Sequence, residues 1–168
     1  MSRMERPSFD VLSFLAEPGR PASVATVTGR GQPALAMMWF AVEDGQVWFH
    51  SPRDDPAPFL RAAERNEPVA VMVATFSPPD DVRQVRMTGP ARLASARDDE
   101  RVRRIYERYV PAWTPDWAQQ ATSENYCLWS MAPHRGMAVA YPGLTGGPPF
   151  HWSSPDSFPT PGTDQELN

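Results

Sequence analysis

The stretch that decides the fold is residues 22–51, ASVATVTGRGQPALAMMWFAVEDGQVWFHS. Runs of apolar, β-branched and aromatic residues at 22–27, 33–42 and 46–51 have the composition typical of strands. Short turns separate these runs, and Asp44-Gly45 supplies residues that tolerate the positive φ angles of a tight hairpin. We therefore expect three consecutive antiparallel strands.

The rest of the chain adds helices and strands without regular alternation. Helical spacing of apolar residues predicts helices over 8–16, with Ser8 as its N-cap, over 55–65, and behind a capping box at Ser95 and Asp98. Further strands are predicted at 68–76, 82–93, 126–131 and 137–141, and residues 112–125 look irregular. This order excludes a doubly wound parallel sheet and predicts a mainly β (α+β) fold, an antiparallel barrel with a few peripheral helices.

Two apolar features of this barrel need cover. The run VAVMVATF at 69–76 is almost continuously apolar, so we expect that strand to be buried on both faces. In the pairs Trp39-Phe40 and Trp48-Phe49, alternation turns one ring inward and the other outward. The outward rings need cover from a partner subunit or a ring-shaped cofactor, which favours a homodimer. Trp113 and Trp117 are candidate walls of an interface or substrate pocket.

The composition excludes several classes of function. The 168 residues carry a net charge of −4, which gives no general attraction to nucleic acid or to an anionic membrane. All 16 basic residues are arginine, so Schiff-base lysine catalysis is impossible. The single cysteine, Cys127, forms no intramolecular disulfide, and no apolar run approaches the roughly 20 residues of a membrane span. With an N-terminus that lacks a signal-peptide core, these features predict a cytoplasmic protein.

The chain divides into two parts by composition. Residues 1–141 contain all the strongly periodic segments and are expected to form one domain. Residues 142–168 are rich in proline, glycine and serine and are interpreted as an arm, which Phe150 and Trp152 anchor to the body.

Several segments resemble the pyridoxamine 5'-phosphate oxidase-like split barrels, a superfamily that includes flavin mononucleotide (FMN) proteins and enzymes that use the deazaflavin F420. They are ASVATVTGRGQPALAMMWFAVEDGQVWFHSPRDDP, FLRAAERNEPVAVMV, VRQVRMTGPARL, and YCLWSMAP followed by HRG. The resemblance implies an antiparallel split β-barrel that works as a homodimer. It also implies FMN or F420 at the dimer interface, and an oxidoreductase that passes a hydride to a small-molecule substrate.

The resemblance also implies where the cofactor lies. The second strand of the family holds the cofactor ring, and the loop after the third strand holds the phosphate. Carried over to this chain, Met37, Met38 and Trp39 line the ring, Ser51 and Arg53 meet the phosphate, Arg61 and Arg86 assist, and Trp152 closes the site from the partner subunit. His50 ends the third strand near this site and is a candidate hydrogen-bond donor to the ring. Because the cofactor ring carries the reaction, no catalytic side chain is expected.

One segment departs from the family pattern. Many relatives place a lysine after the Ser-Arg pair, where this chain has Asp54-Asp55-Pro56-Ala57-Pro58. Loss of a charge-assisted bond to phosphate weakens binding, so a second hypothesis stays open: a non-catalytic split barrel that binds flavin or haem, or has lost its cofactor. His50 or His134 would then be the haem ligand. The spacing of the histidines predicts no other metal site.

Overall fold

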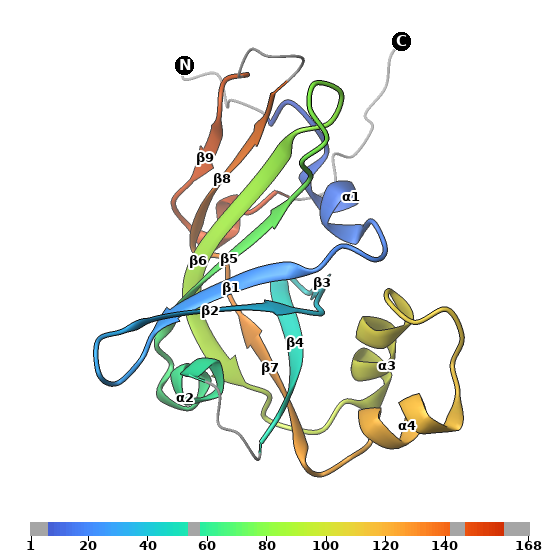
Figure 1. Ribbon diagram of the computed structural model, residues 1–168. Helices are drawn as coiled ribbons and strands as arrows, with labels where there is room; N and C mark the ends of the chain where they lie inside the picture. The colour runs from blue at the N-terminus through green and yellow to red at the C-terminus, as the bar shows by residue number, and fades with distance from the viewer. Residues whose placement is uncertain (1–6, 54–57, 142–146, 160–168) are drawn as a thin grey trace.

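The computed structural model describes residues 7–53, 58–141 and 147–159 (Figure 1). Within these residues, nine strands form one antiparallel sheet with the order β2-β1-β5-β6-β7-β4-β3, and β8 pairs with both β6 and β9. Strands dominate and helices lie at the periphery, which confirms the predicted fold class. No helix in the described part of the chain is long and apolar enough to cross a membrane.

The opening hairpin is confirmed. β1 (Ala22–Val27) and β2 (Pro33–Met38) pair in register, with Ala25 opposite Leu35. The predicted strand 33–42 is interrupted at Trp39 and Phe40 and resumes as β3 (Ala41–Glu43), which pairs with β4 (Gln46–Pro52). The strand order thus begins at β2 and ends at β3, which are joined by two residues only, so the sheet curls back on itself as a split barrel.

The two residues that follow helix α3 (Asp99–Glu107) hold the corner between β2 and β3. The backbone N–H of Phe40 donates to the Tyr109 hydroxyl (3.1 Å), and the Phe40 carbonyl accepts a hydrogen bond from Arg108. The Tyr109 hydroxyl donates in turn to the carbonyl of Arg20 (2.9 Å), which precedes β1. The corner, the start of β1 and the end of α3 are therefore fastened together.

The remaining strands complete the sheet around β6 (Arg83–Leu93), the longest of them. They are β5 (Pro68–Ala74), β7 (Tyr126–Met131), β8 (Arg135–Ala140) and β9 (Phe150–Trp152). Two strands follow one another along the same edge of β6: β8 pairs with residues 83–88 and β7 with residues 91–93. Their connection crosses β6 at Gly89, where a Cβ atom would lie 1.7 Å from the carbonyl oxygen of Ala132. Only glycine fits this crossing.

Strand β5 corrects one expectation. Val69, Val71 and Val73 point into the core, but the alternate residues, including Ala70 and Met72, lie on an exposed face. Within a single chain the prediction of burial on both faces was wrong, because small and unbranched apolar side chains on the outer face made the run look continuous in sequence.

The helices are α1 (Val11–Ala16), α2 (Pro58–Arg65), α3 (Asp99–Glu107), α4 (Pro115–Ala121) and the 3₁₀ helix η1 (Pro155–Ser157). Helix α1 starts later than the sequence predicted, and part of the predicted helix 55–65 lies outside the described residues. Asp10, not Ser8, caps α1, because its carboxylate accepts the Ser13 backbone N–H (3.0 Å). Asp98 caps α3 in the same way, while Ser95 is outside the cap. Helix α4 lies in the stretch predicted to be irregular.

The start of the C-terminal arm packs on the body, as expected. Strand β9 pairs with β8, and Trp152 is 4% exposed, with its indole N–H donating to the Pro133 carbonyl (3.0 Å). Residues 142–146 and 160–168 of this arm lie outside the described residues.

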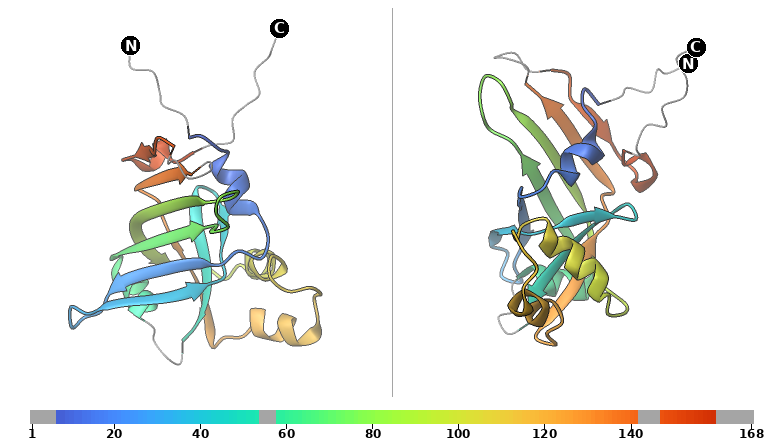
Figure 2. Two further views of the ribbon diagram at one scale, coloured as in Figure 1. Left: turned by 45° about the horizontal axis from the view of Figure 1, so that its top comes forward. Right: turned by 90° about the vertical axis from the view of Figure 1, so that its right-hand side faces the viewer.

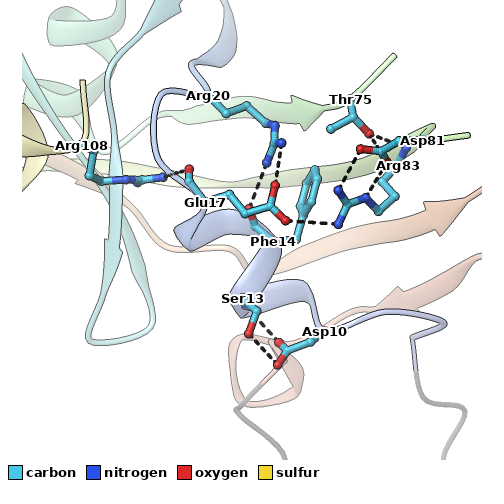
Figure 3. Close-up of polar contacts among 9 residues, drawn as sticks. All are labelled: Asp10, Ser13, Phe14, Glu17, Arg20, Thr75, Asp81, Arg83 and Arg108. Atoms are coloured by element: carbon cyan, nitrogen blue, oxygen red, sulfur yellow. Dashed lines mark hydrogen bonds and ion pairs between the residues drawn. The ribbon is translucent and has the colours of Figure 1, made fainter. Parts of the chain in front are cut away.

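A polar cluster fastens α1 to the β5–β6 hairpin (Figure 3). The Arg83 guanidinium grips both oxygens of Asp81, at 2.7 and 2.9 Å, and also contacts Glu17 (3.2 Å). Glu17 pairs with Arg20 (2.6 Å), and the guanidinium groups of Arg20 and Arg83 each lie 4.7 Å from the centre of the Phe14 ring. Charge pairing and cation–π contact therefore act on the same helix.

We predict that Asp81→Asn lowers the free energy of unfolding at pH 7 by about 0.5–1 kcal/mol, since the pair is bidentate but partly exposed. Hydrogen bonds from Arg83 and Thr75 lower the pKa of Asp81 to about 2. The folded-state pKa lies below the unfolded one, so this stabilisation is full above about pH 4 and is lost as the pH falls toward 2.

Urea unfolding between pH 7 and pH 3 measures this difference, which should shrink toward the acid end. Asp80→Asn, at the exposed neighbouring residue, is the control and should change little. An equal effect of both variants, or a difference that does not depend on pH, would contradict the prediction.

Candidate functional site

A hollow of about 430 Å³ opens beside the corner between β2 and β3. Its walls come from the corner itself, from the end of β4, from α3 and α4, and from the start of β7. The corner turns Trp39 outward because Phe40 is fully buried in the core. Figure 2 shows α3 and α4 together beside the strands that form this corner.

The hollow brings together most of the site residues predicted on strands: Met37, Met38, Trp39, His50 and Ser51. Arg53 lines a second hollow of about 460 Å³, which shares His50 and Tyr126 with the first. The two hollows are thus neighbours on either side of His50. Residues 54–57, where the family lysine is missing, lie outside the described residues.

The other three predicted site residues do not line either hollow. Arg61 is exposed on α2. Arg86 is exposed on the outer face of the sheet, where its guanidinium donates to the Met137 sulfur (3.5 Å) on the neighbouring strand. Trp152 is buried within its own subunit, packed against Phe158.

The cover over the outward aromatic rings comes largely from this chain's own helices, which corrects the expectation of a partner or cofactor alone. Trp39 stacks parallel to Tyr109, with ring centres 5.0 Å apart, and contacts Trp117 on α4 at 5.6 Å. The Arg101 guanidinium of α3 lies 4.1 Å above Trp48. Trp39 is still 36% exposed, so part of its indole is open to the hollow.

His50 lies at the boundary of the two hollows and is held by aromatic neighbours. Its Nδ1 lies 2.9 Å from the Tyr106 hydroxyl, and its ring stacks on Tyr126 with centres 5.1 Å apart. The Tyr106 hydroxyl also accepts the side-chain amide of Gln120 (3.2 Å). Burial lowers the pKa of His50 to about 4 and raises the pKa of Tyr106, so both side chains are neutral at pH 7.

Polar groups around Ser51 and Arg53 are partly engaged. The Ser51 hydroxyl accepts the indole N–H of Trp129 (2.9 Å) and keeps its own proton for another acceptor. The Arg53 backbone N–H donates to the Asn125 carbonyl (2.7 Å), and its Nε lies 3.4 Å from the Tyr126 carbonyl. Burial raises the pKa of Cys127, which lines the second hollow, so its thiol is a poor nucleophile at neutral pH.

The charges of the second hollow are mixed. Arg53 and Arg97 face the carboxylates of Asp98, Asp99 and Glu124, and Arg97 pairs with Asp99 at 2.7 Å. Arg53 lines this second hollow and forms no ion pair with another described residue.

A larger hollow of about 710 Å³ lies between α1, the β3–β4 turn and η1. None of the predicted site residues lines it, and its Arg104 is neutralised by Glu43 at 2.7 Å. The hollow of about 430 Å³ beside Trp39 is the better candidate site, because an open aromatic face and a set of convergent polar groups meet there.

Sequence reasoning named Trp117 as a candidate pocket wall, and Trp117 lines this hollow, whereas Trp113 does not. It missed Tyr106 and Gln120, which complete the same wall. A signal for α4 was present: Thr114 accepts the Trp117 backbone N–H as an N-cap, and Pro115 occupies the first turn. Seven residues are too few for a periodic pattern, so only the cap could have indicated this helix.

Comparison with known proteins gives one family and one fold. The family model described as pyridoxamine 5'-phosphate oxidase matches residues 11–140. The conserved hypothetical protein Rv2991 from Mycobacterium tuberculosis superimposes with a TM-score of 0.65 at 20% identity, over 82% of this chain and 87% of that one. No curated protein matches the sequence.

Two further solved structures share the fold. The haem storage protein HutZ from Vibrio cholerae has a TM-score of 0.58 at 15% identity, over 77% of this chain and 91% of its own. A protein described as an F420 reductase has a TM-score of 0.52 at 21% identity, over 73% of this chain and 93% of its own.

We predict that Tyr109→Phe lowers the free energy of unfolding by about 1–2 kcal/mol, because the Phe40 N–H loses its acceptor in a buried corner. The stacked ring is kept, so the loss reports the hydroxyl alone. Urea unfolding followed by tryptophan fluorescence measures the change, and a variant as stable as the wild type would show that the corner does not depend on this bond.

Proposed function

Because the family model covers residues 11–140, the chain belongs to the pyridoxamine 5'-phosphate oxidase family, and we propose that it is an FMN- or F420-dependent oxidoreductase. One observation carries the proposal: an aromatic hollow, open on one indole face, lies directly beside a hollow that contains Arg53. The first suits a planar ring and the second suits a phosphate group.

The ring half of the site fits a flavin or deazaflavin. Trp39 presents an indole that is stacked on one side and partly exposed to the hollow, which favours stacking with a planar ligand. Met37 and Met38 supply unbranched side chains that adapt to a ring surface. The hollow of about 430 Å³ is within the usual range for small-molecule sites.

The phosphate half depends on Arg53. Its guanidinium can bind a phosphate through charge-assisted hydrogen bonds, and Ser51, two residues earlier, has a hydroxyl proton to donate. The carboxylates of Asp98, Asp99 and Glu124 in the same hollow oppose an anion. We therefore infer that the phosphate is bound with moderate strength and that contacts with the ring contribute most of the cofactor affinity.

Residues of this chain would position and enclose the cofactor, with no side chain as an acid or base. The bound cofactor supplies hydride transfer. Trp39, Trp117 and Tyr126 exclude water from one side of the ring site, and His50 orients a polar edge of the ligand. The substrate would enter over the ring face that Trp39 leaves uncovered.

The proposed homodimer follows from the outer face of the sheet. Leu35 and Met37 on β2 are 74% and 72% exposed, and Met72 on β5 is 37% exposed. Register places Ser23 between Met37 and Met72 and Ala25 between Leu35 and Ala70, so these side chains lie on one face across β2, β1 and β5. Met37 also lines the ring hollow, so a second copy seated on this face borders the site.

A second candidate function is a binding protein that holds flavin or haem without turnover. The mixed charges of the second hollow favour it, because they weaken any anion contact. The structural likeness to a haem storage protein is consistent with it at the level of fold.

The proposed function is tested by titration with FMN, riboflavin, F420 and haemin, followed by absorbance and tryptophan fluorescence. We expect Arg53→Ala to lower the affinity for FMN about tenfold, because one charge-assisted hydrogen bond to the phosphate is lost. The affinity for riboflavin should not change, because riboflavin has no phosphate. Arg30→Ala, on the exposed turn of the first hairpin, is the charge-matched control.

Turnover of bound FMN or F420 with a reductant would support the enzyme. Binding without turnover would favour the second candidate function. Failure of all four ligands to bind at micromolar concentration would overturn both.

The dimer is tested with Leu35→Glu, which places a charge in the centre of the proposed contact. We expect a dimer for the wild type and a monomer with an unchanged circular dichroism spectrum for the variant, as measured by analytical ultracentrifugation. Gln119→Glu, on exposed helix α4, is the control and should stay dimeric. A wild-type monomer would remove this part of the proposal.

A further inference from the structure

Three side chains from different elements form a hydrogen-bonded chain at the site. Gln120 of α4 donates through Nε2 to the Tyr106 hydroxyl of α3 (3.2 Å), and this hydroxyl lies 2.9 Å from Nδ1 of His50 on β4. All three line the same hollow, and Tyr106 is only 2% exposed.

The direction of this chain follows from counting protons. A tyrosine hydroxyl has one proton and can accept as well as donate. Since Gln120 already donates to it, the hydroxyl satisfies its own buried proton by donating to Nδ1 of His50, the other partner within reach among the described residues. Nδ1 is then an acceptor, and the ring proton of neutral His50 is on Nε2.

The surroundings of His50 keep it neutral. Burial lowers its pKa to about 4, and the nearby charges of Asp99 and Arg97 act in opposite directions. Tyr106 and Tyr126 pack against the ring, with ring centres 5.6 and 5.1 Å from that of His50. His50 therefore offers one neutral N–H group and no free lone pair at the boundary of the two hollows.

We propose that Gln120 and Tyr106 lock His50 as an Nε2–H donor that selects a planar ligand with a hydrogen-bond acceptor, a carbonyl oxygen or an unprotonated ring nitrogen, at that edge. The ligand class rests on the proposed function. The lock itself belongs to the free protein and needs no ligand.

The same lock makes His50 unsuitable as an iron ligand. A histidine that ligates a metal through Nε2 presents a bare lone pair there and usually donates its Nδ1–H to an acceptor. The chain from Gln120 imposes the opposite tautomer. His134 and His151 are exposed and line neither hollow, so the described residues place no suitable histidine over the ring site.

The lock is tested by long-range ¹H–¹⁵N NMR of histidine-labelled protein at pH 7, with His50→Gln used to assign the His50 signals. We expect the pattern of a neutral ring protonated on Nε2. Gln120→Glu replaces the donor with a carboxylate of the same shape, so Tyr106 should donate to Glu instead. Neutral His50 should then change tautomer, with its single ring proton on Nδ1, donated to the Tyr106 oxygen, and none on Nε2. Gln119→Glu adds the same charge one residue away and should leave the pattern unchanged.

A wild-type His50 that carries its proton on Nδ1, or that does not respond to Gln120→Glu, would overturn the lock. Haemin gives a second readout: Gln120→Glu should gain a histidine-ligated spectrum that is absent in the wild type. Histidine ligation in the wild type that His50→Gln abolishes would also overturn it.

Selection of the ligand is tested with riboflavin and a pair of His50 variants. A glutamine at position 50 places its amide near the position of Nε2, whereas an asparagine places it near Nδ1. His50→Asn should therefore lower the affinity for riboflavin about fivefold to tenfold, and His50→Gln should lower it less than about threefold. Equal losses would overturn the donor role. If riboflavin does not bind the wild type, the proposed function fails, and the NMR result decides the lock separately.

Discussion

The close passage of the Ala132 carbonyl over Gly89 is the contact on which the arrangement of the sheet depends. It allows β7 and β8 to follow one another along the same edge of β6, so one long strand belongs to both parts of the barrel. Strand β7 in turn pairs with β4 and sets Leu128 opposite His50, so the position of β7 also determines the position of the site. A Cβ atom at Gly89 would collide with the Ala132 carbonyl oxygen, so a side chain there would force this connection to shift.

The site forms where the barrel is least regular. The chain leaves β2, buries Phe40 and exposes Trp39, and Arg108 and Tyr109 fasten this corner. Tyr106, in the last turn of α3, contacts His50, and Arg108 and Tyr109, directly after the helix, hold the backbone of the corner. Fold stability and the shape of the ring hollow are consequently produced by neighbouring residues at the end of α3.

Strands were predictable from the sequence because their signals are local. Alternation in Gln46–Pro52 and the Asp44-Gly45 turn fixed the hairpin and placed His50 and Ser51 on the expected strand. Burial of β5 was predicted wrongly because Ala70 and Met72 are apolar without being internal. The hydrogen bond from Tyr106 to His50 joins residues 56 positions apart, which no local pattern contains. Helix α4 was missed for a different reason, its brevity.

Met37 belongs to two surfaces at once: it lines the hollow, and it stands on the exposed sheet face beside Leu35. A flexible thioether side chain loses rotamer freedom when either surface is covered, and that entropic cost is met only once. If a ligand fills the hollow and a second copy covers the sheet face, as proposed above, the two events would be thermodynamically linked, and each would favour the other by the same factor. A single unbranched residue would then make the two surfaces cooperative without any movement of the backbone.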